Sequence, residues 1–342
     1  MHRRLPTLAF AVLAAALAVV GCGGASDTHD GGGSAQKGDT TLSLVAYSTP
    51  QVVYDEVIPA FSKTAQGEGV GFRQSYGASG DQSRAVENGQ AADVVAFSLA
   101  PDVDRLVKDG LVSSDWTSEP HHGFVSNSVV ALMVRKGNPK GIHTWADLLK
   151  PGVEVLTPNP FTSGSAKWNL MGAYGAQIEQ GKTPAQALDY LRKLLTEHVK
   201  VQDKSGRESV QDFLGGNGDV AISYENEAIT AQQKGADVDY VIPDQTILIQ
   251  NPAAVTKKAK PQAKAFLDYL WTPAAQTVFA KQGYRPVDAS VARRFANRFP
   301  TPKGLFTIDN LGGWTKVNDT FFDPDKGSVT KIEQDAGVST DK

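Results

Sequence analysis

The sequence predicts an α/β protein of two lobes, in which each lobe is a mixed, mostly parallel sheet flanked by helices. Strand-like and helix-like patterns alternate along most of the chain, as in right-handed βαβ units that build a parallel sheet. The 342 residues are enough for about two domains at roughly 150 residues each. The composition, with 41% hydrophobic and 21% charged residues, is that of an ordinary globular protein.

The first residues have the pattern of an export signal. Arg3 and Arg4 precede the uncharged stretch 7–20, which is too short to span a membrane. Cys22, the single cysteine, follows VVG, and this resembles the bacterial lipoprotein lipobox, whose cysteine becomes the lipid-modified first residue of the mature protein. An incidental cysteine at a small-residue cleavage site is the alternative. We expect a signal peptide at 1–21 and an exported chain, anchored through Cys22 on the extracytoplasmic face of the cell membrane.

Residues 22–40 are predicted to form a flexible tether. They contain six glycines and almost no apolar side chains, so they lack the apolar surface that would order them. The globular part is therefore expected to begin at residue 41.

From residue 41 onward, the individual elements follow from apolar periodicity. Val53, Val57, Ile58 and Phe61 recur at helical spacing, whereas short runs rich in valine and isoleucine are typical of buried strands. The predicted strands lie within 41–47, 70–76, 92–98, 129–137, 153–159, 219–225, 237–243 and 247–256. The predicted helices lie within 50–65, 81–89, 144–149, 165–180, 187–198 and 209–216, with two more in 261–283.

Four loops between a strand and a helix share small hydroxyl and glycine residues: Ser48–Thr49, 77–80, 163–165 and 205–206. The first N–H groups of a helix have no partner within it and carry partial positive charge, so they favour a small anion. Each loop alone is more simply a helix cap, and Ser205 with Glu208 fits a capping box. Their convergence at the carboxyl ends of strands favours an anion site in a crevice between the lobes.

Several function classes are disfavoured by the same sequence. The formal net charge is −3 and we find no lysine and arginine cluster, which argues against nucleic acid as a partner. The six histidines show no metal-binding spacing, and we expect neither a metal nor a cofactor. The GxSxG motif is absent, and TSGSA has no base that the sequence identifies, so we expect no enzyme activity.

Long blocks of the chain resemble the sulfate-binding proteins of bacterial sulfate/thiosulfate ABC transporters. The resemblance runs from LVAYSTP to GGWTK, and its most specific blocks are RQSYGASGDQ, ADVVAFSLAPDVD, VRKGNPKGIHTWADLLKPGVEVLTPNP, AKWNLMGAYG, YENEA, YRP and LFTIDNLGGWTK. It implies the type II periplasmic binding protein fold, with the ligand in the interlobe cleft. It also implies a non-enzymatic protein that binds sulfate and delivers it to the permease subunits, with a monomer as the default expectation.

The resemblance further implies a set of ligand-binding residues. In that family a dehydrated dianion is held by backbone N–H groups, a hydroxyl and one aromatic N–H, without a counter-charged side chain. Ser48 and Tyr224 stand where the family has Asp and Trp, and Asp81, where it has Lys, places a negative charge near the site. We expect Arg207 to support its loop without touching the ligand. The implied sulfate-binding residues are Ser48, Ser79, Ser163, Gly164, Ser165, Gly206 and Tyr224.

Lobe boundaries and ligand choice complete the predictions. Lobe I is expected to comprise 41–126 plus 255–342, and lobe II 127–254. A site lined only by donors penalises phosphate, which keeps a proton that needs an acceptor. An inward carboxylate of Asp203 or Glu225 would remove that penalty. The alternatives are a binding protein for thiosulfate, molybdate or phosphate, a secreted phosphate or sulfate ester hydrolase, and a ligand-free adhesin or scaffold.

Overall fold

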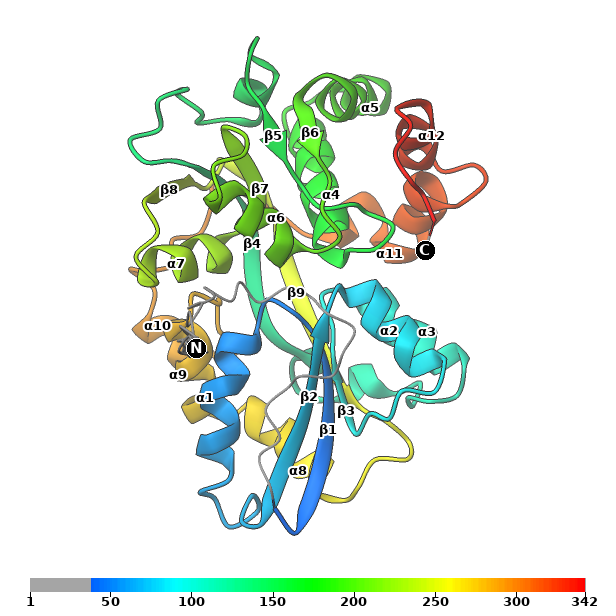
Figure 1. The fold of residues 1–342 in the computed structure, drawn as a ribbon, viewed down its shortest axis with the longest axis vertical. Coiled ribbons are helices and arrows are strands. Elements are labelled where there is room, and N and C mark those ends of the chain that lie inside the picture. Colours follow the sequence, from blue (N-terminus) through cyan, green and yellow to red (C-terminus); the bar gives the residue numbers. More distant parts are fainter. Residues whose placement is uncertain (1–37, 342) are drawn as a thin grey trace, which may run out of the picture.

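The computed structural model describes residues 38–341. The predicted signal peptide, Cys22 and most of the predicted tether lie outside these residues. Figure 1 shows two lobes, one above the other, with the long strands β4 (Phe124–Arg135) and β9 (Gln245–Val255) running between them. The predicted α/β fold, with mostly parallel sheets flanked by helices, is confirmed.

Lobe I is built around three parallel strands. β1 (Thr40–Tyr47) pairs in parallel with β2 (Val70–Gly77) on one side and with β3 (Val94–Ala96) on the other. Apolar side chains of β1 and β2 face α1 and the two helices that follow β9, because they alternate along each strand. The helices of this lobe are α1 (Gln51–Phe61), α2 (Ser79–Glu87), α3 (Ala100–Lys108), α8 (Gln262–Leu270) and α9 (Pro273–Lys281), with 3-10 turns η1 (Trp116–Ser118) and η2 (Pro120–Gly123) before β4.

The two crossing strands join the lobes into one continuous sheet. β9 pairs antiparallel with β3 in lobe I, and it pairs antiparallel with β4 between the lobes. β4 continues into lobe II, where it pairs with β7 and β8. The strand order is therefore β2-β1-β3-β9-β4-β7-β5-β6.

Lobe II surrounds the long buried helix α4 (Gly164–Glu179). Trp168, Leu170 and Met171 of this helix are fully buried against β4, β7 and β9. The other elements are β5 (Val155–Leu156), β6 (Val199–Val201), β7 (Val220–Tyr224), β8 (Val238–Val241), α5 (Pro184–Lys193), α6 (Gly206–Leu214), α7 (Glu225–Gln233), the 3-10 turn η3 (Trp145–Leu149) and the π-helical turn η4 (Leu194–His198).

The C-terminal segment differs from the predicted lobe assignment. The prediction placed all of 255–342 in lobe I, but only α8 and α9 pack in the lobe I core. After α10 (Ala289–Arg294), the short strand β10 (Gly304–Phe306) pairs with β9, and Phe306, Phe321 and Ile332 join the lobe II core. The segment continues through η5 (Ile308–Leu311), α11 (Gly313–Val317), η6 (Asn318–Phe322) and α12 (Ser328–Asp335). Its apolar side chains pack with those of α4 and α5, so this segment is part of the lobe II core.

Candidate functional site

Helix starts from both lobes meet where the lobes touch. Lobe I contributes the start of α2 at Ser79, directly after β2, and lobe II contributes the starts of α4, α6 and α7, each after a strand or its loop. The first N–H groups of each helix have no acceptor within the helix. The arrangement therefore directs backbone donors and positive helix ends toward one interlobe region.

Ser98, which follows β3 in lobe I, is the central contact of this region. Its Oγ lies 2.7 Å from the hydroxyl oxygen of Tyr224, at the end of β7 in lobe II. Its N–H donates to Ser79 Oγ at 3.0 Å, and its carbonyl accepts from Trp168 Nε1 at 2.9 Å. One residue thus connects a predicted ligand residue of lobe I with one of lobe II.

Small residues are required where α4 and α6 approach this contact. A β-carbon on Gly164 would lie 2.9 Å from Ser98 Oγ, closer than real contacts of this kind. A β-carbon on Gly206 would lie 2.6 Å from Ser165 Oγ, which itself lies 2.8 Å from Ser163 Oγ. The predicted residues Ser79, Ser163, Gly164, Ser165, Gly206 and Tyr224 are therefore linked through short contacts, and all of them are buried.

The two loops of lobe II that carry these residues are joined to each other. Asn159 N–H donates to the carbonyl of Asp203 at 2.8 Å, and the Asn159 carbonyl accepts from Ser163 N–H at 2.9 Å. Thr162 Oγ1 donates to the carbonyl of Lys204 at 2.8 Å. The loop before α4 and the loop before α6 therefore form one connected unit.

Arg207 crosses from lobe II to lobe I. Its Nη1 donates to Gln51 Oε1 at 2.5 Å, and its Nη2 donates to the carbonyl of Ser48. Ser48, which was predicted to bind the ligand, is buried, with 3% of its surface exposed. Arg207 does more than support its own loop, because both of these partners belong to the opposite lobe.

The carboxylates near the site are engaged by neighbouring groups. Asp203 accepts from Ser209 Oγ at 2.7 Å, and Glu225 accepts from Arg285 at 2.6 and 3.0 Å. Asp81 forms an ion pair with Arg84 at 2.5 Å and, across the lobes, with Lys204 at 3.0 Å. The negative charge that we expected at Asp81 is therefore balanced by two cations.

Glu227 is a buried carboxylate of the site that the sequence did not identify. Its Oε2 accepts from Ser223 Oγ at 2.6 Å, and its Oε1 accepts from Thr49 of lobe I at 3.4 Å. Burial raises the pKa of Glu227, while Ser223 and the positive charge of Arg207 act in the opposite direction. Ser98 and Asp102, which accepts from Ser79 Oγ at 2.6 Å, were also missed. Ser98 is the last residue of the predicted strand 92–98, so it shared with the other loops the signal of a small hydroxyl residue at the end of a strand.

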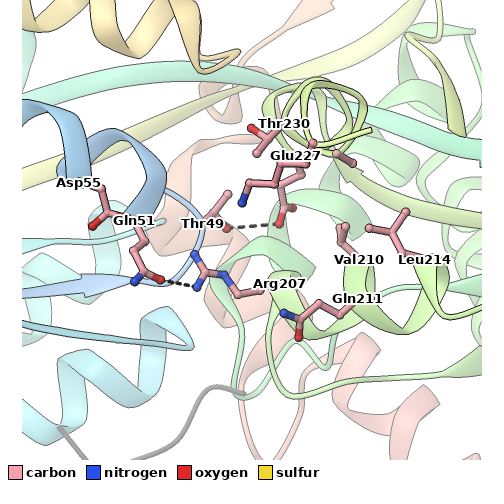
Figure 2. A pocket seen from close by; sticks show the side chains of 11 residues that line it. Thr49, Gln51, Asp55, Arg207, Val210, Gln211, Leu214, Glu227 and Thr230 are labelled. Atoms are coloured by element: carbon pink, nitrogen blue, oxygen red, sulfur yellow. Dashed lines mark hydrogen bonds between the residues drawn. The ribbon is translucent and has the colours of Figure 1, made fainter. Parts of the chain in front are cut away.

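A pocket of about 390 Å³, lined in part by Thr49, Arg207 and Glu227, opens between α1 and the helices α6 and α7. Figure 2 shows Arg207 hydrogen-bonded to Gln51, and Thr49 hydrogen-bonded to Glu227, among the residues that line it. Asp55 and Lys234 also line it. Arg207 lines this pocket, but none of the predicted sulfate-binding residues does. The pocket is therefore separate from the buried cluster around Ser98.

The described part of the chain lacks two further kinds of feature. Within residues 38–341, no group of three or more His, Cys, Asp or Glu side chains is arranged to hold a metal ion. In the same range no helix combines the length and the apolar character needed to cross a membrane.

Comparisons with known proteins identify relatives of this chain. The family model described as "bacterial extracellular solute-binding protein" matches residues 42–285. A sulfate-binding protein of Synechococcus elongatus is 43% identical, over 94% of this chain and 93% of its own length. A sulfate-binding protein of Escherichia coli is 41% identical, over 83% and 90%. The structure of the sulfate-binding protein SubI from Mycobacterium tuberculosis matches with a TM-score of 0.80 and 48% identity, over 82% of this chain and 98% of SubI.

Proposed function

This chain belongs to the bacterial extracellular solute-binding proteins, and from that premise we propose that it captures sulfate and delivers it to the permease of an ABC transporter. The observation that carries the proposal is the interlobe cluster of helix starts and hydroxyls around Ser98, in a chain whose relatives are named for binding sulfate. Such proteins bind and release their ligand without converting it.

In this proposal the dianion is held by donors from both lobes. The N–H groups of Ser79, Gly164, Ser165 and Gly206 donate to its oxygens, and Ser163 adds a hydroxyl. Ser48 and Tyr224 complete the enclosure. Because the ligand accepts donors from lobe I and lobe II at once, it stabilises the arrangement in which the lobes touch.

Selectivity in the proposal depends on the protons of the ligand. Sulfate only accepts hydrogen bonds, so it matches a set of N–H and O–H donors, whereas phosphate retains a proton that needs an acceptor. Two carboxylates lie beside the proposed ligand residues: Asp102 accepts from Ser79 Oγ at 2.6 Å, and Glu227 Oε2 lies 3.5 Å from the position of a β-carbon on Gly206. The oxygens of Glu227 already accept from Ser223 and Thr49, and Asp102 already accepts from Ser79, which supports sulfate over phosphate.

We also propose where the protein is located in the cell. Residues 1–21 act as a signal peptide, and a lipid on Cys22 anchors the mature chain, as a monomer, at the outer face of the cell membrane. Lobe I then comprises 41–126 and the part of 255–342 that packs with it, and lobe II comprises 127–254 with the C-terminal segment. Mass spectrometry of the membrane fraction tests the lipid, and a Cys22→Ser variant is expected in the soluble fraction.

Calorimetric titration of the chain from residue 23 onward tests the ligand. We expect one sulfate per chain, with weaker binding of thiosulfate, molybdate and phosphate at the same pH and ionic strength. Ser163→Ala should weaken sulfate binding by about 10- to 100-fold, as expected for one hydrogen bond to a charged ligand. Ser114→Ala, at an exposed serine outside the set of predicted ligand residues, is the matched control. Equal binding by Ser163→Ala, or a preference for phosphate, would contradict the proposed site.

A further inference from the structure

A buried carboxyl group at the C-terminal end of the chain lies against one of the proposed ligand loops. Glu333 on α12 is 0% exposed, and its Oε2 accepts from Nε2 of Gln202 at 2.8 Å. Gln202 directly follows β6 and is four residues before Gly206. Figure 1 shows α12, in red, beside α5 on the flank of lobe II.

The second oxygens of both side chains lack a partner. Glu333 Oε1 and Gln202 Oε1 are both buried, and neither has a hydrogen-bond partner among residues 38–341. Two oxygens without hydrogens cannot bond to each other, and leaving each unsatisfied in the interior is unfavourable. A proton on Glu333 Oε1 would give the carboxyl a donor for the Gln202 oxygen, while Oε2 continues to accept from the Gln202 nitrogen.

The surroundings of Glu333 favour the neutral carboxyl. Glu333 forms no ion pair within the described residues, and the charged groups of the elements packed against α12 have other partners or are exposed. Arg192 of α5 pairs with Asp335 at 3.9 Å, and buried His198 of η4 contacts the carbonyl of Val153. The remaining charged side chains of these elements are exposed: Asp189, Lys193, Glu197, Asp319, Lys331 and, next to β6, Lys200. Burial raises the pKa of Glu333 to about 7, and the donor of Gln202 only partly opposes it.

The chain after α12 holds the other ligand loop. The carbonyl of Ser339 accepts from Asn159 Nδ2 at 2.9 Å. Asn159 in turn holds Asp203 of the neighbouring loop and accepts from the N–H of Ser163. The C-terminal segment therefore contacts both loops, one at Asn159, which accepts from Ser163 N–H, and the other at Gln202, four residues before Gly206.

We propose that Glu333 is a positioning residue for anion binding, which carries a proton that closes a two-bond pair with Gln202 and thereby fixes the loop leading to Gly206. This inference rests on the proposed function of the cleft. Loss of the proton leaves a carboxylate facing an amide oxygen, so the loop is held by one bond instead of two. Sulfate affinity therefore falls as the pH rises through the pKa of Glu333, and sulfate binding in turn increases proton uptake.

The test is calorimetric titration with sulfate from about pH 5.5 to about pH 8.5, on both sides of the pKa. Sulfate remains a dianion throughout, so the ligand itself does not titrate. We expect wild-type affinity to fall by about two- to tenfold across this range, the loss of roughly one hydrogen bond. In E333Q the side-chain amide replaces the carboxyl donor, so its affinity should match that of the wild type at low pH and show no such decline. D335N, which removes an exposed charge from the same helix, should keep the wild-type profile.

Two further measurements separate the inference from the proposed function. Titration near pH 7 in buffers of different ionisation enthalpy should show proton uptake with sulfate in the wild type and none in E333Q. The pH dependence of unfolding without ligand reports the Glu333 proton independently of binding. If sulfate affinity still declines with pH in E333Q, Glu333 is not the positioning residue. The positioning role is also overturned if unfolding reports the Glu333 proton while sulfate affinity does not change with pH. Absence of sulfate binding by the wild type at every pH would instead refute the proposed function.

Discussion

Replacing Gly164 with alanine tests whether closure of the lobes determines affinity. Gly164 begins α4 in lobe II, and its α-carbon lies against lobe I. An alanine β-carbon there would lie 2.9 Å from both Ser98 Oγ and Leu99 Cγ, and 3.0 Å from Ser98 Cβ. Ser98 cannot easily yield, because its N–H, carbonyl and hydroxyl are all bonded.

The expected loss of sulfate affinity depends on when the alanine β-carbon overlaps with Ser98 and Leu99. Overpacking of this kind costs about 1–3 kcal/mol, and here it arises only when the lobes touch. The backbone N–H of residue 164 is retained, so the donor itself is not lost. We therefore expect the sulfate dissociation constant to rise by about 5- to 150-fold, while the ligand-free protein keeps nearly its wild-type melting temperature.

The assay is sulfate calorimetry combined with thermal unfolding of the ligand-free protein. Gly172→Ala is the matched control on the same helix, because its β-carbon would meet Val130 Cγ2 at 3.2 Å and Ile247 Cγ2 at 3.3 Å inside the lobe II core. That variant should lose stability but bind sulfate nearly normally. If Gly164→Ala binds sulfate within about twofold of wild type, the close interlobe contact does not belong to the ligand-bound state, and our reasoning fails.

Three further predictions follow from contacts around the site. Tyr224→Phe removes the partner of Ser98 across the lobes, so sulfate affinity should fall by at least about two- to tenfold in calorimetry; unchanged affinity would mean that this bond does not stabilise closure. Arg207→Ala removes the bond to Ser48 of lobe I and should weaken sulfate about tenfold with little change in ligand-free melting, and a variant with wild-type affinity and stability would exclude that role. For Glu333 the folded pKa of about 7 lies above the ordinary value of 4.5, so the folded state holds a proton that the unfolded chain releases between these values. The wild type should therefore lose up to about 3 kcal/mol of unfolding free energy as the pH rises through this window, and Glu333→Gln should not. Urea unfolding at the two ends of the window measures this, and parallel curves for both proteins would contradict it.

Apolar periodicity in the sequence was sufficient to locate a helix or strand that has one clearly apolar face. The strands β1 and β2 and the helices α4, α8 and α9 lie close to their predicted positions, because burial of apolar side chains dominates their stability. The helix α7 was not predicted. It buries Glu225, Asn226 and Glu227 together with Ala228 and Ile229, so it has no apolar stripe that a pattern would reveal.

The sequence likewise revealed some features of the candidate site and not others. The Ser and Gly loops are visible in the sequence, since a helix start that binds an anion needs small residues and free N–H groups near the end of a strand. The sequence does not contain the distances between such loops. That Ser98 bonds Tyr224, 126 residues away, or that Arg207 reaches Ser48, 159 residues away, depends on how the lobes pack.

By itself the sequence determined the α/β class and the four loops of small hydroxyl and glycine residues, because each depends on residues close together in the chain. Only the tertiary structure decided which charges are balanced and which segment supports the site. Asp81 forms an ion pair with Lys204 of the opposite lobe. The C-terminal helix α12, which the prediction assigned to lobe I, packs on lobe II and contacts Gln202. Both outcomes depend on complementary surfaces formed by distant segments, and such complementarity exists only after the chain has folded.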